Sequence, residues 1–494
     1  MTKHDVGTEL THSNRNGNVV LKRSPSQEES TRRQPSLGRI RRVHMVGIGG
    51  IGMSSIAEVL LRRGYHVTGS DLKKSDITEG LESLGASIHE GHEANNIVGA
   101  DVVVYSSAVN IRENPETLEA ERLRIPLISR AVMLGELMRM KFGIGVAGTH
   151  GKTTTTSMAG LVVAEGGFDP TIIVGGKVAS FGSNAVAGEG DIILIEADEY
   201  DRTFLRLTPS LAVITNIEAD HLDIYKDLDD IKDAFVEYAN SVPFFGATIL
   251  CLDDENVQTI IGRIDRRVRT YGTTRQAEIR ADNIKRDGLQ TSFDVLEHGK
   301  KLGSLTLGTP GMHNVYNALA AVAIGLELDM PFERIAAGLR RFSGVQRRFQ
   351  MLGEVNDIVV IDDYAHHPTE VKATLAAASE GWPERRIIAV FQPHLYSRTR
   401  DCKEEFARAF FDADLVYITD IFGAREEPIP GVDGLMVAEL MLQYGHRDVQ
   451  YVPDLEELPS LLTDILQPGD IVITMGAGNI WRYGRRLYDQ LQAN

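Results

Sequence analysis

Short runs of apolar, mostly β-branched residues alternate along the chain with longer stretches in which apolar positions recur at helical spacing. The first set of runs lies at residues 43–48, 65–69, 101–105, 143–146, 191–195 and 211–215. Strands that are apolar along their whole length, with helices between them, are typical of parallel sheets covered on both faces. We therefore predict an α/β fold built on parallel sheets.

A second set of apolar runs begins late in the chain, at residues 358–361, 386–390, 414–418 and 470–474. The pattern is interrupted near residues 143 and 344, which predicts three α/β domains at residues 39–143, 144–343 and 344–494. Strand-like, turn-rich sequence between residues 265 and 310 indicates a small antiparallel patch added to the central domain. Residues 1–38 are polar and lack an apolar period, which predicts a disordered tail.

Length, charge and cysteine content narrow the class of protein. The 494 residues exceed the length at which one hydrophobic core stops growing. A net charge of −17 argues against a protein that coats nucleic acid or membrane surfaces, so we expect no nucleic-acid partner. Cys251 and Cys402 match no zinc or redox spacing, which favours a reducing cytoplasm without disulfides. Neither a membrane-spanning run nor a secretory signal is evident, so we expect no membrane insertion.

A first glycine-rich turn, GIGGIG at residues 47–52, follows a predicted strand and precedes a helical pattern. Asp71 lies 19 residues after its last glycine, at the end of the next strand. Such a turn lets the backbone approach a pyrophosphate at a helix N-terminus, while the acid binds a ribose hydroxyl. Taken alone, this fingerprint favours an NAD-dependent enzyme over a purely structural turn, although the spacing itself specifies only a diphosphate-bearing nucleotide.

A second glycine-rich turn, GTHGKT at residues 148–153, also lies between a predicted strand and a helical pattern. It departs from the strict Walker pattern because Val146 stands where the first glycine is expected. The glycines nevertheless free backbone N–H groups, Lys152 suits the β- and γ-phosphates, and Thr153 suits Mg²⁺. We therefore predict a phosphate-binding loop rather than a coincidental turn.

Acidic clusters follow two predicted strands downstream of this loop, EADEYD at residues 196–201 and NIEADH at residues 216–221. The carboxyl ends of parallel strands line the ligand crevice, so these acids lie where Mg²⁺ on a phosphate needs oxygen ligands. Acidic clusters are usually solvated loops, and the phosphate loop in the same domain favours the functional interpretation here.

The third domain contributes two arginines at residues 347–348 and the motif DDYAHHP at residues 362–368. Adjacent residues on a strand point to opposite faces, so we do not expect a single four-ligand zinc site that includes both His366 and His367. We interpret the histidines as residues that orient a substrate. Arg398, beyond the next strand, suits a carboxylate or a developing phosphate charge.

Together these motifs resemble those of the Mur ligases of peptidoglycan synthesis. The chain carries, in the order and at roughly the separations of that family, GIGGIGMS, AGTHGKTTTT, EADEYD, TNIEADHLD, HNVYNALAA, RRF, DDYAHHPTEV and FQPHLYSRT. The resemblance covers residues 40–494, and its first and last motifs are the most specific, since folylpolyglutamate synthetase shares the phosphate loop. It implies a Rossmann-like UDP-sugar domain, a P-loop ATPase-type central domain that binds ATP, and a Rossmann-like C-terminal domain that binds an amino acid.

The resemblance also implies an activity. We expect an ATP-dependent ligase that joins L-alanine to the lactyl carboxylate of UDP-N-acetylmuramate through an acyl phosphate and releases ADP and phosphate. The expected cofactors are ATP and two Mg²⁺ ions, which Mn²⁺ can replace, and the expected partners are UDP-N-acetylmuramate and L-alanine. Such an enzyme serves cell-wall synthesis, cell shape and cell division. We expect it to be a cytoplasmic monomer or weak homodimer.

Carried over motif by motif, the resemblance implies several sets of site residues. Those expected at ATP are Gly148, Thr149, His150, Gly151, Lys152, Thr153, Thr154, Asn314, Asn317, Arg348 and Asp363. Those expected at the UDP-sugar are Gly49, Gly50, Ile51, Gly52, Ser70, Asp71, Ser106, Ser107 and Arg130. The expected metal ligands are Thr153 and Glu196 for one ion and His221 for a second. The amino-acid pocket is expected to contain Tyr364, His366 and Arg398, and the expected catalytic residues are Lys152, Asn216, His221, His366 and Arg398.

Two positions depart from the family pattern. Leu395 stands where relatives often have arginine, which places more weight on Arg398 as the ligand of the amino-acid carboxylate. Several later Mur ligases carry a carbamylated lysine at the position that corresponds here to Phe235, with Lys232 three residues earlier. We therefore expect no carbamate.

Other functions remain open from the sequence. If the protein were an NAD-dependent oxidoreductase, Lys152, Glu196 and His221 would have no role in its reaction. A nucleotide-switched binding protein would hydrolyse ATP slowly to gate a partner. Within the ligase class, the enzyme could instead add a preformed peptide or another amino acid to the same sugar.

Overall fold

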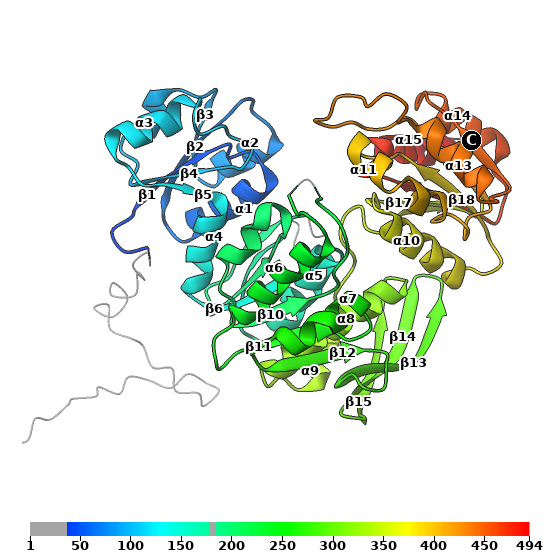
Figure 1. Ribbon diagram of the computed structural model, residues 1–494, viewed down its shortest axis with the longest axis horizontal. Helices are drawn as coiled ribbons and strands as arrows, with labels where there is room; N and C mark the ends of the chain where they lie inside the picture. Colours follow the sequence, from blue (N-terminus) through cyan, green and yellow to red (C-terminus); the bar gives the residue numbers. More distant parts are fainter. Residues whose placement is uncertain (1–36, 177–183, 223, 494) are drawn as a thin grey trace, which may run out of the picture.

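The computed structural model describes residues 37–176, 184–222 and 224–493, which form three units, each built on its own sheet (Figure 1). The predicted tail lies outside the described residues except for residues 37 and 38. Leu37 packs against the core and donates its backbone N–H to the Tyr65 hydroxyl at 3.0 Å. No helix within the described ranges is long and apolar enough to cross a bilayer.

The N-terminal unit has a five-stranded parallel sheet in the order β3-β2-β1-β4-β5. Its strands are β1 (Arg42–Val46), β2 (His66–Asp71), β3 (Ser87–Glu90), β4 (Val102–Tyr105) and β5 (Leu127–Ser129). Its helices are α1 (Ile51–Arg62), α2 (Asp76–Ser83), α3 (Pro115–Leu123) and α4 (Arg130–Arg139). The strand order reverses beside β1, because β1 pairs with both β2 and β4. The first glycine turn follows β1 at this switch point, where α/β sheets bind ligands.

The central unit has a ten-stranded sheet in the order β15-β14-β13-β12-β11-β10-β6-β9-β7-β8. Its strands are β6 (Phe142–Ala147), β7 (Thr171–Ile173), β8 (Ala185–Ala187), β9 (Ile192–Glu196), β10 (Leu211–Ile214), β11 (Ala247–Cys251), β12 (Val268–Gly272), β13 (Ile279–Asp287), β14 (Gln290–Glu297) and β15 (Lys300–Leu307). Its helices are α5 (Lys152–Glu165), α6 (Leu228–Asn240), α7 (Glu255–Ile260), α8 (Met312–Glu327) and α9 (Phe332–Arg340). Strands β13, β14 and β15 pair antiparallel, which confirms the predicted antiparallel patch.

Helix α5 is buried nearly all round because it packs against α8 and α9 as well as the sheet. Its run of threonines suits this position, although β-branched residues are poor helix formers. The Thr156 hydroxyl donates to the Lys152 carbonyl at 2.8 Å, and the Thr155 hydroxyl donates to Asn317 Oδ1 at 3.0 Å. Each of these buried hydroxyls is thus satisfied, and one of them ties α5 to α8.

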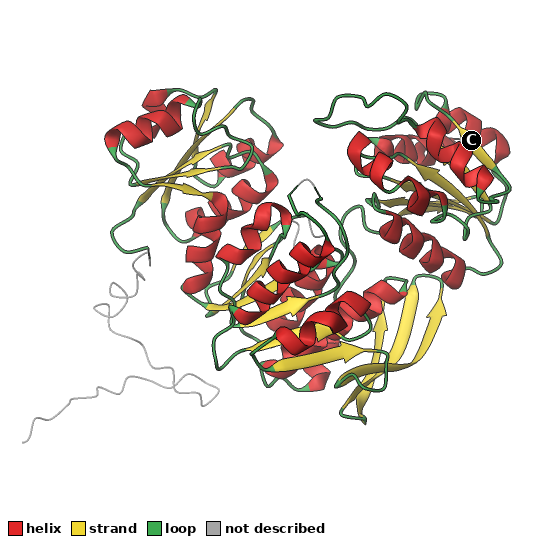
Figure 2. Cartoon of the chain, viewed as in Figure 1, coloured by secondary structure: helices red, strands yellow, loops and turns green. Residues whose placement is uncertain are grey.

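The C-terminal unit has a six-stranded sheet in the order β16-β17-β21-β18-β19-β20, parallel except for β16. Its strands are β16 (Gln350–Val355), β17 (Ile358–Asp363), β18 (Arg386–Phe391), β19 (Leu415–Ile418), β20 (Val449–Tyr451) and β21 (Asp470–Met475). Its helices are α10 (Pro368–Gly381), α11 (Tyr396–Asp401), α12 (Lys403–Ala407), α13 (Gly434–Gln443), α14 (Leu458–Ile465) and α15 (Ile480–Ala493). Helices cover both faces of this sheet (Figure 2).

The three-unit α/β architecture confirms the predicted fold class. The predicted domain boundaries stay predictions, and the first of them, at residue 143, falls within β6. Polar contacts join the central unit to both neighbours. Asn184 donates to the Ile51 carbonyl at the start of α1 at 3.0 Å, and Thr369 at the start of α10 donates to Glu218 at 2.7 Å.

Candidate active site

The second glycine turn connects β6 to the N-terminus of α5 and needs both of its glycines. Gly148 and Gly151 have φ angles of 134° and 81°, a region that L-residues rarely adopt. A Cβ at Gly148 would clash with the Thr215 hydroxyl, and a Cβ at Gly151 would lie 2.6 Å from Asn317 Oδ1. The loop is therefore held between the carboxyl end of β10 and helix α8, with the N-terminus of α5 facing it.

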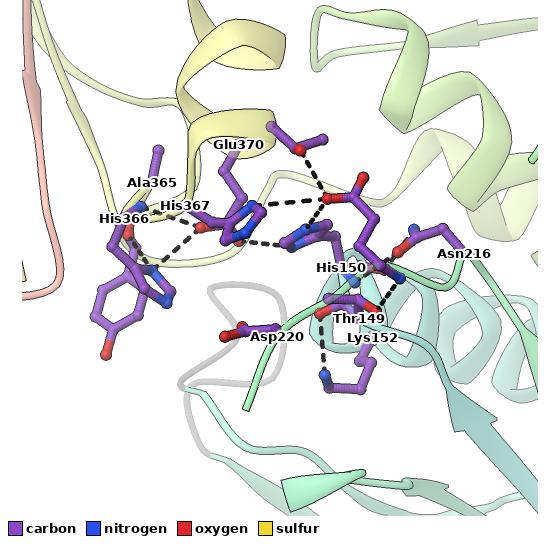
Figure 3. Close-up of polar contacts among 12 residues, drawn as sticks. Thr149, His150, Lys152, Asn216, Asp220, Ala365, His366, His367 and Glu370 are labelled. Atoms are coloured by element: carbon purple, nitrogen blue, oxygen red, sulfur yellow. Dashed lines mark hydrogen bonds and ion pairs between the residues drawn. The ribbon is translucent and has the colours of Figure 1, made fainter. Parts of the chain in front are cut away.

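Asn216 fixes the shape of this loop from the neighbouring strand end. Its Oδ1 accepts the His150 backbone N–H at 2.8 Å, and its Nδ2 donates to the His150 carbonyl at 3.0 Å (Figure 3). The catalytic role predicted for Asn216 stays a prediction. Its observed contacts are with the loop backbone.

Lys152 lies at the first position of α5, held by the loop and by an acid that follows β9. Its Nζ donates to the Gly148 carbonyl at 2.8 Å, to the Thr149 carbonyl at 3.1 Å and to Glu199 Oε2 at 2.7 Å. Burial alone would lower the pKa of Lys152, but the charges of Glu199 and Asp198 raise it above its usual value. The lysine is therefore a permanent cation directed at the loop.

Two predicted metal ligands, Thr153 and Glu196, meet beside the lysine. The Thr153 hydroxyl donates to Glu196 Oε1 at 2.8 Å, while Glu196 Oε2 accepts the Gly175 backbone N–H at 2.6 Å. Burial raises the pKa of Glu196, although this hydrogen bond to Gly175 and the charge of Lys152 oppose the shift. A hydroxyl and a half-buried carboxylate at the end of a phosphate loop form the oxygen donor set that Mg²⁺ prefers. These residues therefore fit the predicted ion.

His221, the predicted ligand of a second ion, lies on the other side of Glu199. Its Nε2 is 3.8 Å from Glu199 Oε1 and 3.7 Å from Asp220 Oδ2, and its ring packs edge-on against Tyr200. Burial lowers the pKa of His221, although the charge of Asp220 opposes this shift, and the charge of Lys152 adds to it. The imidazole is therefore neutral near pH 7, as a metal ligand must be.

A cavity of about 310 Å³ adjoins the phosphate loop and lies between the central and C-terminal units. It is lined by every residue predicted to bind ATP except Gly148: Thr149, His150, Gly151, Lys152, Thr153, Thr154, Asn314, Asn317, Arg348 and Asp363. Asn216 and Glu196 line it as well. Three segments far apart in the sequence thus meet around one space.

Asp363 is tightly held where β17 ends. Its carboxylate accepts the backbone N–H groups of Phe349 at 2.9 Å and Ala365 at 2.8 Å, and the Thr374 hydroxyl at 3.1 Å. Burial raises the pKa of Asp363 to about 6, although the charge of Arg348 opposes this shift. Arg348 itself donates to Glu370 at 2.9 Å. Asp363 therefore fixes the segment that carries Arg348, in addition to lining the cavity.

A second cavity, of about 780 Å³, holds the predicted amino-acid residues Tyr364, His366 and Arg398 together with His221 and Leu395. Arg398 Nη2 lies 3.4 Å from Asp220 Oδ1 and so links the C-terminal unit to the central unit. His366 Nδ1 is 3.0 Å from the Tyr364 carbonyl and 3.1 Å from Glu370 Oε2.

The predicted UDP-sugar residues gather at the start of α1. The Gly49 N–H donates to Asp71 Oδ2 at 2.8 Å, and a Cβ at Gly52 would clash with the Arg130 guanidinium. Ser70 turns away from this site, since its hydroxyl donates to the buried Glu116 at 2.5 Å. The remaining members lie at the rim of the switch point, with Gly50, Ile51 and Ser107 exposed and Ser106 half-buried.

Sequence reasoning missed the carboxylates that organise the site: Asp198, Glu199, Glu218, Asp220 and Glu370. Four of them lie within the motifs EADEYD and NIEADH. These motifs located the two acidic clusters but did not show which contacts each acid makes. Glu370 lies in the first turn of α10, four residues after His366, which precedes the N-cap residue His367 and contacts the Glu370 carboxylate. That spacing was the available signal for Glu370.

Models of one protein family match almost the whole described chain. The Mur ligase family catalytic domain matches residues 42–142, the Mur ligase middle domain residues 146–325, and the Mur ligase glutamate ligase domain residues 347–478. The chain belongs to the Mur ligase family. Mur ligases are ATP-dependent ligases of peptidoglycan precursor synthesis, so this membership disfavours both the oxidoreductase and the binding-protein interpretations.

Individual relatives cover the same length. A UDP-N-acetylmuramate–L-alanine ligase of Salinibacter ruber is 66% identical over 461 residues, 93% of this chain and 97% of the relative. One of Geotalea uraniireducens is 53% identical over 92% of this chain and 99% of its own. The crystal structure of the UDP-N-acetylmuramate-alanine ligase of Thermotoga maritima is 29% identical, with a TM-score of 0.76 over 92% of this chain and 99% of that chain.

Phe235, predicted to correspond to the carbamylated lysine of several other Mur ligases, is fully buried on α6 and packs edge-on against Phe204 at 5.2 Å. Lys232 lies one turn earlier on the same helix. The absence of a carbamate stays a prediction.

Proposed function

We propose that this Mur ligase joins L-alanine to the lactyl carboxylate of UDP-N-acetylmuramate, with hydrolysis of ATP to ADP and phosphate. The observation that carries this proposal is the contact of Arg398 with Asp220, which brings the predicted amino-acid residues of the C-terminal unit to the strand end beside the phosphate loop. The choice of substrates draws on relatives named for this reaction, one of them 66% identical. In the first cavity, Asn314 and Asn317 would face the adenosine side of ATP.

In the first step the lactyl carboxylate attacks the γ-phosphorus of ATP, and ADP leaves. Two anions must approach each other, so the barrier depends on positive charge placed in advance. Lys152 would supply that charge from the first turn of α5, whose N-terminus would also face the phosphates. Thr153 and Glu196 would hold one Mg²⁺ and His221 a second. When bound, these ions offset the charge of the transferring phosphoryl group.

In the second step the neutral amine of L-alanine attacks the acyl carbon, and phosphate leaves the tetrahedral intermediate. Arg398 would bind the alanine carboxylate, with Tyr364 lining the same pocket. His366 would accept the ammonium proton, because its ring lies in that cavity and is held by the Tyr364 carbonyl and Glu370. Leu395 offers only an apolar wall, and we assign the alanine carboxylate to Arg398 although Arg400 and Arg425 line the same cavity.

Water must be excluded, because an acyl phosphate hydrolyses readily. Contacts between the central and C-terminal units meet this need. Thr369 donates to Glu218, Arg398 contacts Asp220, and Arg425 donates to the Tyr200 hydroxyl at 3.1 Å. We expect the units to separate for substrate entry and to re-form these contacts before chemistry.

The test is phosphate release measured against a panel of co-substrates. With ATP and Mg²⁺, release should require UDP-N-acetylmuramate and L-alanine together and should match amide formation mole for mole. The panel includes glycine, L-serine and a preformed peptide. A hydrophobic pocket discriminates a methyl group by about 1–3 kcal/mol, so slow turnover of glycine is compatible with the proposal. Preference for the peptide, or phosphate release without the sugar nucleotide, would contradict it.

A further inference from the structure

Three side chains from separate segments converge between the phosphate loop and α10, outside the sets assigned to Mg²⁺. They are His150 on the loop, Glu218 after β10, and His367 immediately before α10. Their donor atoms all lie within 4.8 Å of one another. Figure 3 shows the rings of His150 and His367 side by side, and their centroids are 5.0 Å apart.

We propose that His150, Glu218 and His367 bind a transition-metal cation of the Zn²⁺ class at the interface between the central and C-terminal units. The spacing of the donors supports a tetrahedral site. Zinc–nitrogen and zinc–oxygen bonds are about 2.0–2.2 Å long, so two ligand atoms on a tetrahedral ion lie about 3.4 Å apart. His150 Nε2 is 3.3 Å from Glu218 Oε2, and His367 Nδ1 is 3.6 Å from the same oxygen.

An unsatisfied nitrogen points into this space. His367 is 7% exposed, and its Nδ1 has no hydrogen-bond partner among the described residues. The Glu218 oxygen that it faces is too distant for a hydrogen bond but well placed as a fellow ligand. Buried polar atoms without partners are rare and mark strain, catalysis or a missing ion. A cation shared with Glu218 would satisfy this nitrogen.

The surrounding residues resemble the outer shell of a metal site. His150 presents Nε2 to the cluster, while its Nδ1 lies 3.5 Å from Glu370 Oε1. Histidine ligands commonly direct their second nitrogen at a carboxylate, which fixes the tautomer and raises their basicity. The Thr369 hydroxyl donates to Glu218 Oε2 at 2.7 Å and orients that carboxylate. Two imidazoles and one carboxylate leave a fourth position for water or substrate.

This donor set separates the site from the predicted Mg²⁺ ligands. Mg²⁺ prefers oxygen ligands, and only one imidazole, that of His221, is assigned to it, whereas two imidazoles in one site favour zinc, cobalt or nickel. The ligands also come from two units, so a bound cation would tie α10 to the phosphate loop.

The test uses the full chain, stripped with a chelator and kept in excess Mg²⁺, with Co²⁺ as a spectroscopic probe. Nitrogen-ligated tetrahedral Co²⁺ gives strong visible absorption, and Zn²⁺ should displace it. We expect one saturable ion per chain and a higher unfolding temperature with the ion bound. His367→Gln and Glu218→Gln should each weaken binding by about tenfold or more. His394→Gln, which changes a histidine of the same unit outside the cluster, should bind as the wild type does.

Two results would overturn the site. One is a wild-type protein that takes up no tetrahedral Co²⁺ and is not stabilised by Zn²⁺. The other is uptake that is equal in the wild type, His367→Gln and Glu218→Gln, which would locate the ion elsewhere on the surface. Glutamine is polar and close in size to both histidine and glutamate, and circular dichroism checks that each variant is folded. A single folded variant is therefore enough to test the site.

Discussion

Lys152 and Glu199 form a buried ion pair in which Nζ lies 2.7 Å from one carboxylate oxygen and 2.9 Å from the other. The lysine that the sequence assigns to phosphate is therefore paired with an acid of the same unit. The ion pair keeps the lysine ordered and charged. We expect the lysine to turn from Glu199 towards the phosphates when ATP binds.

Replacement of Lys152 by alanine should abolish most ligation. Loss of one preorganised positive group at a developing anion commonly costs about 10²–10³ in kcat. We expect a fall of at least that size in amide formation with both co-substrates present, measured by product chromatography. Binding of UDP-N-acetylmuramate, measured by calorimetry, should persist. An undiminished rate of amide formation would refute the mechanism.

Arg398→Lys should weaken mainly the binding of the amino-acid substrate. The planar guanidinium can bind a carboxylate through two hydrogen bonds, and lysine cannot. We expect the KM for L-alanine to rise by about tenfold, with a much smaller change in the KM for ATP. Arg408→Lys is the matched control, because Arg408 is exposed and packs over Tyr444. Equal effects on both substrates would show that Arg398 acts through unit closure instead.

Gly148→Ala should remove nucleotide binding. Its φ of 134° and the close Thr215 hydroxyl leave no room for a Cβ. Gly64→Ala isolates the backbone effect, since Gly64 has a φ of 83° with nothing within 4 Å of the added atom. We expect the control to lose about 1 kcal/mol of stability and to keep ATP affinity. Titration with a fluorescent nucleotide measures the ATP affinity of both variants. An unchanged ATP affinity of Gly148→Ala would contradict this account of the loop.

Glu116→Gln should change the acid stability of the N-terminal unit. Burial on its own would raise the pKa of Glu116, but the His44 imidazole 3.7 Å away and hydrogen bonds from Ser70 and Asn96 lower it to about 2. The folded-state pKa lies below the usual value of 4.5, so the stabilisation is complete above about pH 4.5 and is lost as the pH falls towards 2. Glutamine should remove this pH-dependent part and cost about 1–3 kcal/mol at neutral pH.

Thermal unfolding of the Glu116→Gln variant at several pH values measures that effect. The control is Glu119→Gln on the same helix, where Glu119 pairs with Arg122 at the surface. Parallel stability curves for the wild type and Glu116→Gln between pH 4.5 and 2 would contradict the assigned pKa.

The architecture followed from the sequence because the strands of buried parallel sheets are apolar throughout. The runs at residues 191–195 and 470–474 correspond closely to β9 and β21. Strand order was not predictable, since β6 pairs with β9 and β10, which are distant in the sequence. Local patterns carry no information on such pairings.

The phosphate loop was identified because glycine, lysine and threonine occur at fixed spacing, whereas Glu370 was missed because two of its partners are distant in the sequence. Arg348 lies before β16 of the same unit, and the contact with His150 exists only once α10 lies against the central unit. Strand geometry predicts that His366 and His367 point to opposite faces and cannot share one four-ligand zinc site. In the structure, however, His367 lies at the start of a helix. Its ring meets His150, whereas the ring of His366 meets Tyr364.

The six residues 216–221 form the wall between the two cavities. Asn216 and Glu218 line the first cavity, whereas Asp220 and His221 line the second. A compound that shifts this segment from one side therefore alters the shape of the other side, and thermodynamic reciprocity requires that each ligand change the affinity of the other by the same factor. Inhibitors of the two cavities should for that reason be ranked in combination, since potency measured one at a time would misjudge a pair.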